Sequence, residues 1–326
     1  MVVPLRGMTR SRCLLLGVLA TFAAACGART PTAREHQPGT TDGVVAAAVA
    51  PPGPPLSVER LMDDARWLCD PARAGRGSFQ PAALVTAGYV ETVFRDAGLE
   101  VSRQPIRDGA VNVIGIRRAA DPDGAQAVLV SAHYDHLGVD DAGTVFPGAD
   151  DNASGTAVLL ALARHGAARP FRKSVVYVAF GAEETGLEGS AAYVRAPPWP
   201  LADTVAVINF DMVGRNFFEL GSGKEATAAA VTEDLALFAA AARSAGDAGL
   251  LLIRTPPRAL QIFGSDFRTD EWMFRAYGVR AIHFSTGIHE DYHQPTDTVD
   301  RLVPAQMVRI AATAAGLIDA LAGPAS

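Results

Sequence analysis

The chain has 326 residues, of which 49% are hydrophobic, so it can form one large domain or two small ones with a sizeable core. Its formal net charge of −6, with no sustained run of lysine and arginine, argues against a nucleic-acid partner. No segment recurs with a period of about 20–50 residues, so a solenoid is not expected.

The first 26 residues have the anatomy of a secretory signal. Three arginines precede an apolar stretch that ends at Ala25 and is shorter than the about 20 residues needed to cross a bilayer. Small residues before Cys26 resemble a bacterial lipoprotein signal, although Ala23 stands where such signals usually have leucine. The alternatives are ordinary secretion with Cys26 incidental, or a cytosolic chain with an apolar start. We expect an exported protein, lipid-anchored at Cys26 and facing the periplasm or the exterior, or otherwise secreted.

Residues 27–55 are rich in Ala, Pro, Gly and Thr and cannot bury enough apolar surface to offset the entropy of ordering, so they predict a flexible linker. The folded domain is expected over residues 56–326. Once the signal is removed, Cys69 is the only cysteine besides Cys26, which leaves the domain without an intramolecular disulfide.

Strands and helices are predicted to alternate along this domain. Ser57 can cap a first helix that runs to Leu68. Apolar and alternating runs predict strands at 101–106, 111–116, 127–131, 174–180, 205–210 and 279–284. Helical patterns cover 81–97, 156–165, 225–245 and 304–322. Pro105 restricts the first strand to a sheet edge. The pattern predicts an α/β domain, with a mixed, largely parallel central sheet and helices on both faces in three layers.

Five short polar segments carry side chains that can hold a metal. Three of them, around His133, Glu183 and Asp211, directly follow predicted strands, whose carboxyl ends meet at one edge of an open sheet. The other two are the acidic loop at Asp150-Asp151-Asn152 and the loop around His293. Each segment alone has an ordinary explanation, such as a helix cap, a solvated glutamate pair or a core histidine. Together they offer two imidazoles, at least three carboxylates and a spare glutamate, which suits two metal ions.

The residue types also suggest how some of these groups work. Asp135 lies two residues after His133, where it can accept the second ring N–H and fix the tautomer. Of Glu183 and Glu184, one can bind metal while the other takes a proton from water. His136 adjoins the first segment and either lines the cleft or lies on the surface. Mixed imidazole and carboxylate ligands suit zinc, although manganese or cobalt could substitute.

In this order, the five segments resemble the secreted dizinc aminopeptidases of the bacterial leucyl aminopeptidase and aminopeptidase Y family. Their clan also holds glutamate carboxypeptidase II and the glutaminyl cyclases. The resemblance runs from about Leu61 to about Leu302 and implies two Zn²⁺ per chain. Ser265-Asp266 is similar to a Ser-Asp-His segment of the family, but Phe267 replaces its histidine. The resemblance implies these roles: His133 and Asp211 on one zinc, Glu184 and His293 on the other, Asp151 bridging both, Glu183 as general base, Asp135 orienting His133, and Tyr292 hydrogen-bonded to the oxyanion.

The resemblance implies a metal-dependent exopeptidase that releases N-terminal residues from peptides with a free N-terminus. A glutaminyl cyclase and a carboxypeptidase or dipeptidase of the same clan are the enzymatic alternatives. The presence of both His133 and Asp211 favours two metals over the single zinc usually described for the cyclases. A non-catalytic surface lipoprotein that uses the fold for binding is the remaining alternative.

Overall fold

In the computed structural model, the residues described are 56–120, 124–217, 226–257 and 268–324. They all belong to one compact unit, which spans residues 50–326. The predicted signal segment, the linker, Cys26 and the segment Ser265–Phe267 lie outside the described residues, so these predictions stay predictions.

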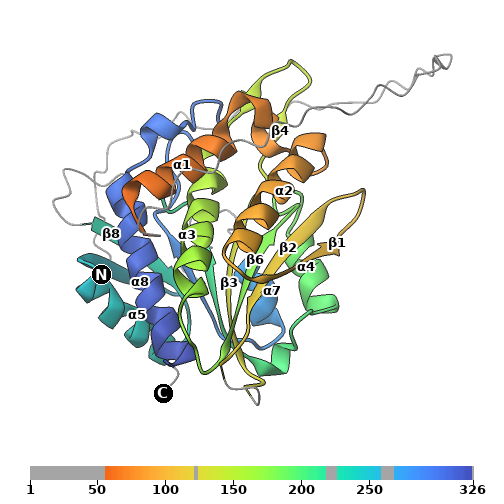
Figure 1. Cartoon of the computed structure of the whole chain (residues 1–326). Helices are drawn as coiled ribbons and strands as arrows, with labels where there is room; N and C mark the ends of the chain where they lie inside the picture. Colours follow the sequence, from red (N-terminus) through yellow and green to blue (C-terminus); the bar gives the residue numbers. More distant parts are fainter. Residues whose placement is uncertain (1–55, 121–123, 218–225, 258–267, 325–326) are drawn as a thin grey trace, which may run out of the picture. The chain divides into compact units, whose positions relative to one another are not determined.

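An eight-stranded sheet forms the centre of the domain (Figure 1). Its strands lie in the order β1-β2-β6-β3-β7-β10-β8-β9. The central four, β6, β3, β7 and β10, are parallel, and antiparallel pairings join β2 to β6 and β8 to β10. The bounds are β1 Glu100–Pro105, β2 Val111–Arg117, β3 Ala127–His133, β6 Ser174–Phe180, β7 Thr204–Phe210, β8 Ala226–Val231, β9 Leu250–Thr255 and β10 Ala281–Ser285. A separate hairpin pairs β4 Gly138–Val139 with β5 Val145–Phe146.

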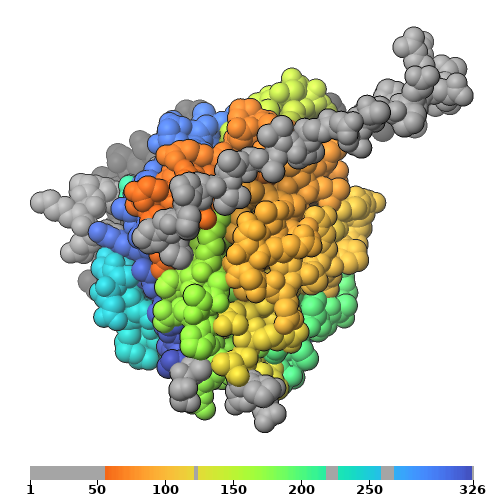
Figure 2. Space-filling model, in the orientation of Figure 1, coloured from red at the N-terminus to blue at the C-terminus, as the bar shows by residue number. Residues whose placement is uncertain are grey.

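Helices cover both faces of this sheet, as predicted. The larger core cluster joins one face to α1 Val58–Cys69, α2 Pro81–Asp96, α3 Gly155–Ala167, α5 Leu235–Asp247 and α8 Pro304–Ala322. The smaller cluster joins the opposite face to α4 Glu188–Arg195 and α7 Asp270–Ala276. Short helical turns lie at η1 Pro71–Arg76, η2 Ala149–Ser154, η3 Leu201–Asp203 and η6 Val299–Arg301. Figure 2 shows α1, α2, α3 and α5 covering the first face.

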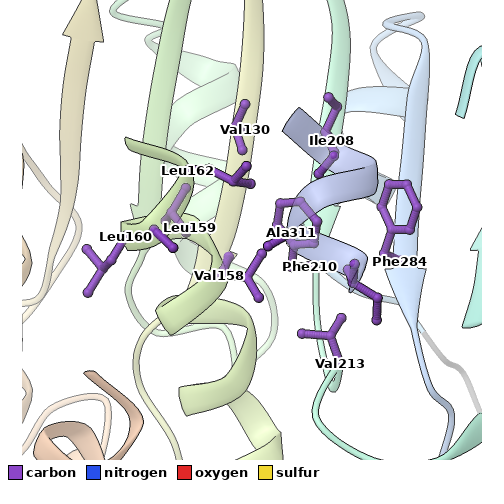
Figure 3. Packing of buried hydrophobic residues seen from close by; sticks show 14 of the residues in the cluster. Val130, Val158, Leu159, Leu160, Leu162, Ile208, Phe210, Val213, Phe284 and Ala311 are labelled. Atoms are coloured by element: carbon purple, nitrogen blue, oxygen red, sulfur yellow. The ribbon is translucent and has the colours of Figure 1, made fainter. Parts of the chain in front are cut away.

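Buried strands and apolar helix faces account for this packing. Every residue of β3 and of β6 is buried, as expected for strands covered on both sides. Figure 3 shows Val158 and Leu162 of α3 lying towards Val130 of β3, and Ala311 of α8 lying beside Phe210 and Phe284. Of the described helices, only α8 is long and apolar enough to cross a membrane, and about half of its apolar window is buried inside the domain (56%). Packing in the core therefore explains its composition.

One predicted element was wrong. The alanine-rich segment 225–245 was expected to be a single helix, but Ala226–Val231 forms β8, and the helix α5 begins only at Leu235. Alanine favours helices by less than about 1 kcal/mol per residue, and tertiary pairing overrides that preference. Here β8 lies between β10 and β9 in the sheet. Asp234 marks the true start of the helix, because its carboxylate accepts a hydrogen bond from the Leu237 N–H.

Candidate metal centre

Parallel strands bring the three strand-end segments to one edge of the sheet. His133 ends β3 and pairs in register with Phe180, the last residue of β6. Glu183 and Glu184 follow β6 within four residues, and Asp211 directly follows β7. His133 and Asp211 are far apart in the sequence but meet at this edge, where the His133 Nε2 lies 3.3 Å from the Asp211 Oδ1.

The acidic loop reaches the same edge of the sheet at η2. The side chains of its two adjacent aspartates, Asp150 and Asp151, point in different directions there. The Asp151 carboxylate lies between two imidazoles, with Oδ1 3.5 Å from the His133 Nε2 and Oδ2 3.1 Å from the His293 Nε2. Asp150 turns the other way. It accepts hydrogen bonds from the Gly214 N–H at 2.6 Å and the Ser154 hydroxyl at 3.0 Å. Its second oxygen lies 3.1 Å from the His289 Nε2, so Asp150 ties loops together away from the cluster.

A third carboxylate, Asp297, fixes the acidic loop by its backbone. Asp297 accepts the N–H of Asp150 at 2.9 Å and the N–H of Asp151 at 3.1 Å. Asn152 joins the loop to the end of β7, because its amide donates to the Phe210 carbonyl at 2.9 Å. The position of the Asp151 carboxylate is therefore set by contacts to two separate segments of the chain.

Glu184 and His293 form the other half of the cluster. The His293 Nε2 lies 3.2 Å from the Glu184 Oε2, and the Tyr292 ring stacks on the His293 ring with centroids 3.8 Å apart. Glu183 lies on the opposite side, where one of its oxygens, a His133 nitrogen and an Asp211 oxygen are all within 4.8 Å of one another. The adjacent glutamates thus face different halves of the cluster.

The Asp135 carboxylate contacts the backbone N–H groups of both glutamates as well as lying near His133. Its carboxylate accepts the Glu183 N–H at 3.1 Å and the Ser78 hydroxyl at 2.5 Å. The His133 Nδ1 is 3.8 Å from the Asp135 carboxylate, which is an ion-pair distance, and 3.3 Å from the Asp135 carbonyl oxygen. Asp135 therefore positions the β6 loop as well as standing beside the imidazole, which the sequence did not indicate.

The electrostatics of the cluster show an excess of buried negative charge. Burial and the neighbouring Glu184 raise the pKa of Asp151 to about 6. Burial opposes a charge on His133, but Glu183 and Asp211 outweigh it and raise the pKa of this imidazole well above its ordinary value. Burial also raises the pKa of Glu183 well above normal. Burying carboxylates together is costly unless a cation compensates their charge.

The residues present fit a divalent metal. Zinc–ligand bonds of about 2.0–2.1 Å in a tetrahedron place ligand atoms about 3.3 Å apart. The distances within the cluster range from 3.1 to 3.5 Å for the atoms of His133, Asp151, Asp211, Glu184 and His293. Nitrogen and oxygen donors of this kind are the ligands that zinc takes in hydrolytic sites. Spacing, donor type and uncompensated charge therefore agree.

Comparison with known proteins assigns the chain to a family. Residues 112–318 match the model of peptidase family M28. The chain belongs to peptidase family M28. The resemblance recognised from the five segments is thereby confirmed, and the matched region contains all five of them. The described residues 56–111 precede the match.

Relatives of the chain agree in family and fold. Aminopeptidase YwaD of Bacillus subtilis is 39% identical over 107 residues, which are 32% of this chain and 22% of that protein. The chain spans about a quarter of the length of the first curated relatives it matches. Solved structures include an aminopeptidase from Aneurinibacillus (TM-score 0.67, 16% identity, 83% of this chain and 95% of that chain). Another is glutaminyl cyclase from Porphyromonas gingivalis (TM-score 0.64, 20% identity, 81% and 98%). These two likenesses bear on the fold alone and confirm the mixed, largely parallel sheet.

Two further side chains lie at this cluster: His136, which the sequence left between the cleft and the surface, and Asp270, which the sequence did not indicate. The His136 Nδ1 lies 2.7 Å from the Glu184 Oε1. Asp270, at the start of α7, is fully buried, and burial raises its pKa to about 7, which the nearby His133 opposes. The sequence signal for His136 was its position three residues after His133, a candidate ligand. Asp270 had none, because only the packing of α7 under the sheet edge brings it there.

Arg76 joins the backbone near His133 to the acidic loop. It is fully buried and donates to four carbonyls, those of Leu68, Tyr134, Pro147 and Gly148, at 2.7–2.9 Å. Replacing Arg76 with leucine is expected to lower the free energy of unfolding by about 3–5 kcal/mol, because buried acceptors lose their donor. Urea denaturation measures this.

The matched control is Arg66→Leu. Arg66 is exposed and pairs with Asp63 on the surface of α1, so its loss is expected to cost less than about 1 kcal/mol. Equal midpoints and slopes for Arg76→Leu and the wild type would show that Arg76 does not stabilise these loops.

Proposed function

We propose that this chain is a zinc-dependent exopeptidase that removes N-terminal residues from peptides, using two metal ions at the cluster described above. The observation that supports it most strongly is the placement of Asp151. Its two oxygens face different imidazoles, His133 and His293. Asp211 completes the first set of donors and Glu184 the second. Membership of peptidase family M28 supports hydrolysis of peptides as the reaction.

Zinc bound there would lower the pKa of water and polarise the substrate carbonyl. The chain's own residues would supply the proton transfers. Glu183 lies beside the first set of donors, and its Oε atoms can accept a proton from the attacking water and return it to the leaving amine. Burial and the neighbouring carboxylates raise the pKa of Tyr292 well above normal, so its phenol stays protonated and can donate to the developing oxyanion.

For the location of this chemistry, we propose export, with a lipid anchor at Cys26. The support is the sequence of the first 26 residues alone. Labelling of cells with a radioactive fatty acid tests the anchor. A labelled wild-type chain and an unlabelled Cys26→Ala chain are expected. Export without label would leave ordinary secretion.

Removal of metal carries the second prediction. A panel of aminoacyl p-nitroanilides should be hydrolysed by the purified protein, and a chelator should abolish the reaction, with recovery on adding Zn²⁺. Blocking the substrate's α-amine by acetylation should also abolish it, because an aminopeptidase must bind the free amine. Metal analysis of the same sample should give two zinc ions per chain.

The same panel separates the alternatives. Hydrolysis of amine-blocked peptides from the C-terminal end would indicate a carboxypeptidase. Cyclisation of an N-terminal glutamine with one bound zinc would indicate a glutaminyl cyclase, whose fold this domain shares. Absence of both bound zinc and activity would indicate a binding protein.

A further inference from the structure

His136 lies beside the second set of donors, although no role is implied for it. Its ring is buried, with 1% of its surface exposed. The His136 Nδ1 lies 2.7 Å from the Glu184 Oε1 and 3.8 Å from the Asp151 Oδ2. With Asp151 and Glu184, His136 forms one of the two groups in the described part of the chain whose ligand atoms all lie within 4.8 Å of one another.

His136 is fixed by a hydrogen bond of its backbone and by packing against its ring. Its backbone N–H donates to the Arg76 carbonyl at 3.2 Å, and Arg76 itself donates to the carbonyl of the preceding Tyr134. On the other side, Gly148 lies so close that a Cβ there would be 2.4 Å from the His136 Cδ2. The acidic loop therefore packs directly on the imidazole, and only glycine fits at that contact.

The distance to Glu184 identifies a hydrogen bond rather than a pair of metal ligands. Two ligand atoms of one tetrahedral zinc lie about 3.3 Å apart, whereas an N–H donor and a carboxylate oxygen lie about 2.7–2.9 Å apart. His136 and Glu184 fall in the second range at 2.7 Å, and His293 and Glu184 fall near the first at 3.2 Å. His136 thus takes one oxygen of Glu184 and leaves the other to face His293.

We propose that His136 is a positioning residue for the second metal: its Nδ1–H holds the Glu184 Oε1, so that Glu184 offers only Oε2 to the ion. This inference rests on the proposed function, because it assumes a metal between Glu184, His293 and Asp151. The physical reason is orientation. A carboxylate fixed by a hydrogen bond loses little rotational freedom when it binds metal, and losing such a partner typically weakens metal binding by about 10–100-fold.

The test compares zinc affinity at the two sites in the full-length protein. Apo-protein is titrated with Zn²⁺ against a competing chelator, and a stepwise titration with Co²⁺ shows the absorption change that accompanies the second equivalent of metal. In His136→Ala, the second zinc is expected to bind about 10–100-fold more weakly while the first is unchanged. In His136→Asn, the amide Nδ2–H stands near the position of Nδ1–H and should restore most of the affinity. His165→Asn, at the end of α3 and away from the cluster, is the matched control and should bind as the wild type does.

Each other outcome is informative. Unchanged affinity of the second site in His136→Ala would overturn the proposal. Equal loss in the alanine and asparagine variants, with a changed cobalt spectrum, would also overturn it, because His136 would then be a ligand. The proposed function fails separately: a wild-type protein that binds fewer than two zinc ions contradicts it before any variant is compared. Thermal unfolding of each apo-protein shows whether a variant has lost its fold. If His136→Ala has, His136→Leu, which keeps the bulk of the side chain but has no N–H, takes its place, and unchanged affinity of the second site in that variant overturns the proposal.

Discussion

Replacing Glu183 with glutamine is expected to lower kcat by about 10²–10⁴-fold while both zinc ions stay bound. Glutamine keeps the size of the side chain but cannot accept the proton of the attacking water. The backbone of Glu183 would not move, because its N–H is held by Asp135 at 3.1 Å. Initial rates on an aminoacyl p-nitroanilide, with metal analysis of the same preparation, measure both parts of the result.

The second readout matters because Glu183 is close to His133 and Asp211. If glutamine at this position also removed one zinc, Glu183 would be a ligand, and another group would have to act as base. Full activity with both metals bound would rule out the proposed mechanism. Glu290→Gln is the matched control, since this glutamate precedes the His293 loop with 73% of its side chain exposed and should be dispensable.

Replacing Asp151 with asparagine is expected to have the largest effect on metal content. The substitution removes the charge of the carboxylate whose oxygens lie 3.5 Å from the His133 Nε2 and 3.1 Å from the His293 Nε2. Because both sets of donors share this residue, both zinc ions should bind more weakly, by more than the about 100-fold that loss of an outer hydrogen-bond partner can cause. Activity should fall to background, and equilibrium dialysis against Zn²⁺ measures the loss.

The neighbouring residue supplies the control. Asp150→Asn changes the same charge one residue earlier, but Asp150 faces Gly214, Ser154 and His289. It should keep both metals and lower stability by about 1–3 kcal/mol through the weakened buried hydrogen bonds. The reverse pattern, with metals lost in Asp150→Asn and kept in Asp151→Asn, would show that the bridging residue has been misassigned.

The sequence predicted an element correctly where its local residue pattern is compatible with only one kind of secondary structure. Apolar runs placed β3, β6 and β7, because a strand covered on both faces must be apolar along its length. Pro105 restricted β1 to a sheet edge, where it lies, because proline cannot donate to a ladder. Local pattern failed at β8, since an alanine-rich run takes its conformation from its neighbours.

The sequence by itself determined the fold class, the family and the list of candidate side chains, because these depend on residue types and their order at strand ends. The residue pattern left Asp150 and Asp151 equivalent and the resemblance pointed to Asp151, but only the tertiary structure shows the contacts that turn Asp151 towards the imidazoles and Asp150 away from them. Asp150 and Asp151 are chemically identical, and the choice between them depends on Asp297, Gly214 and His289, which lie 64 to 147 residues away in the chain. The same holds for His136, whose contact with Glu184 spans 48 residues. Such contacts arise from packing, and no local pattern records them.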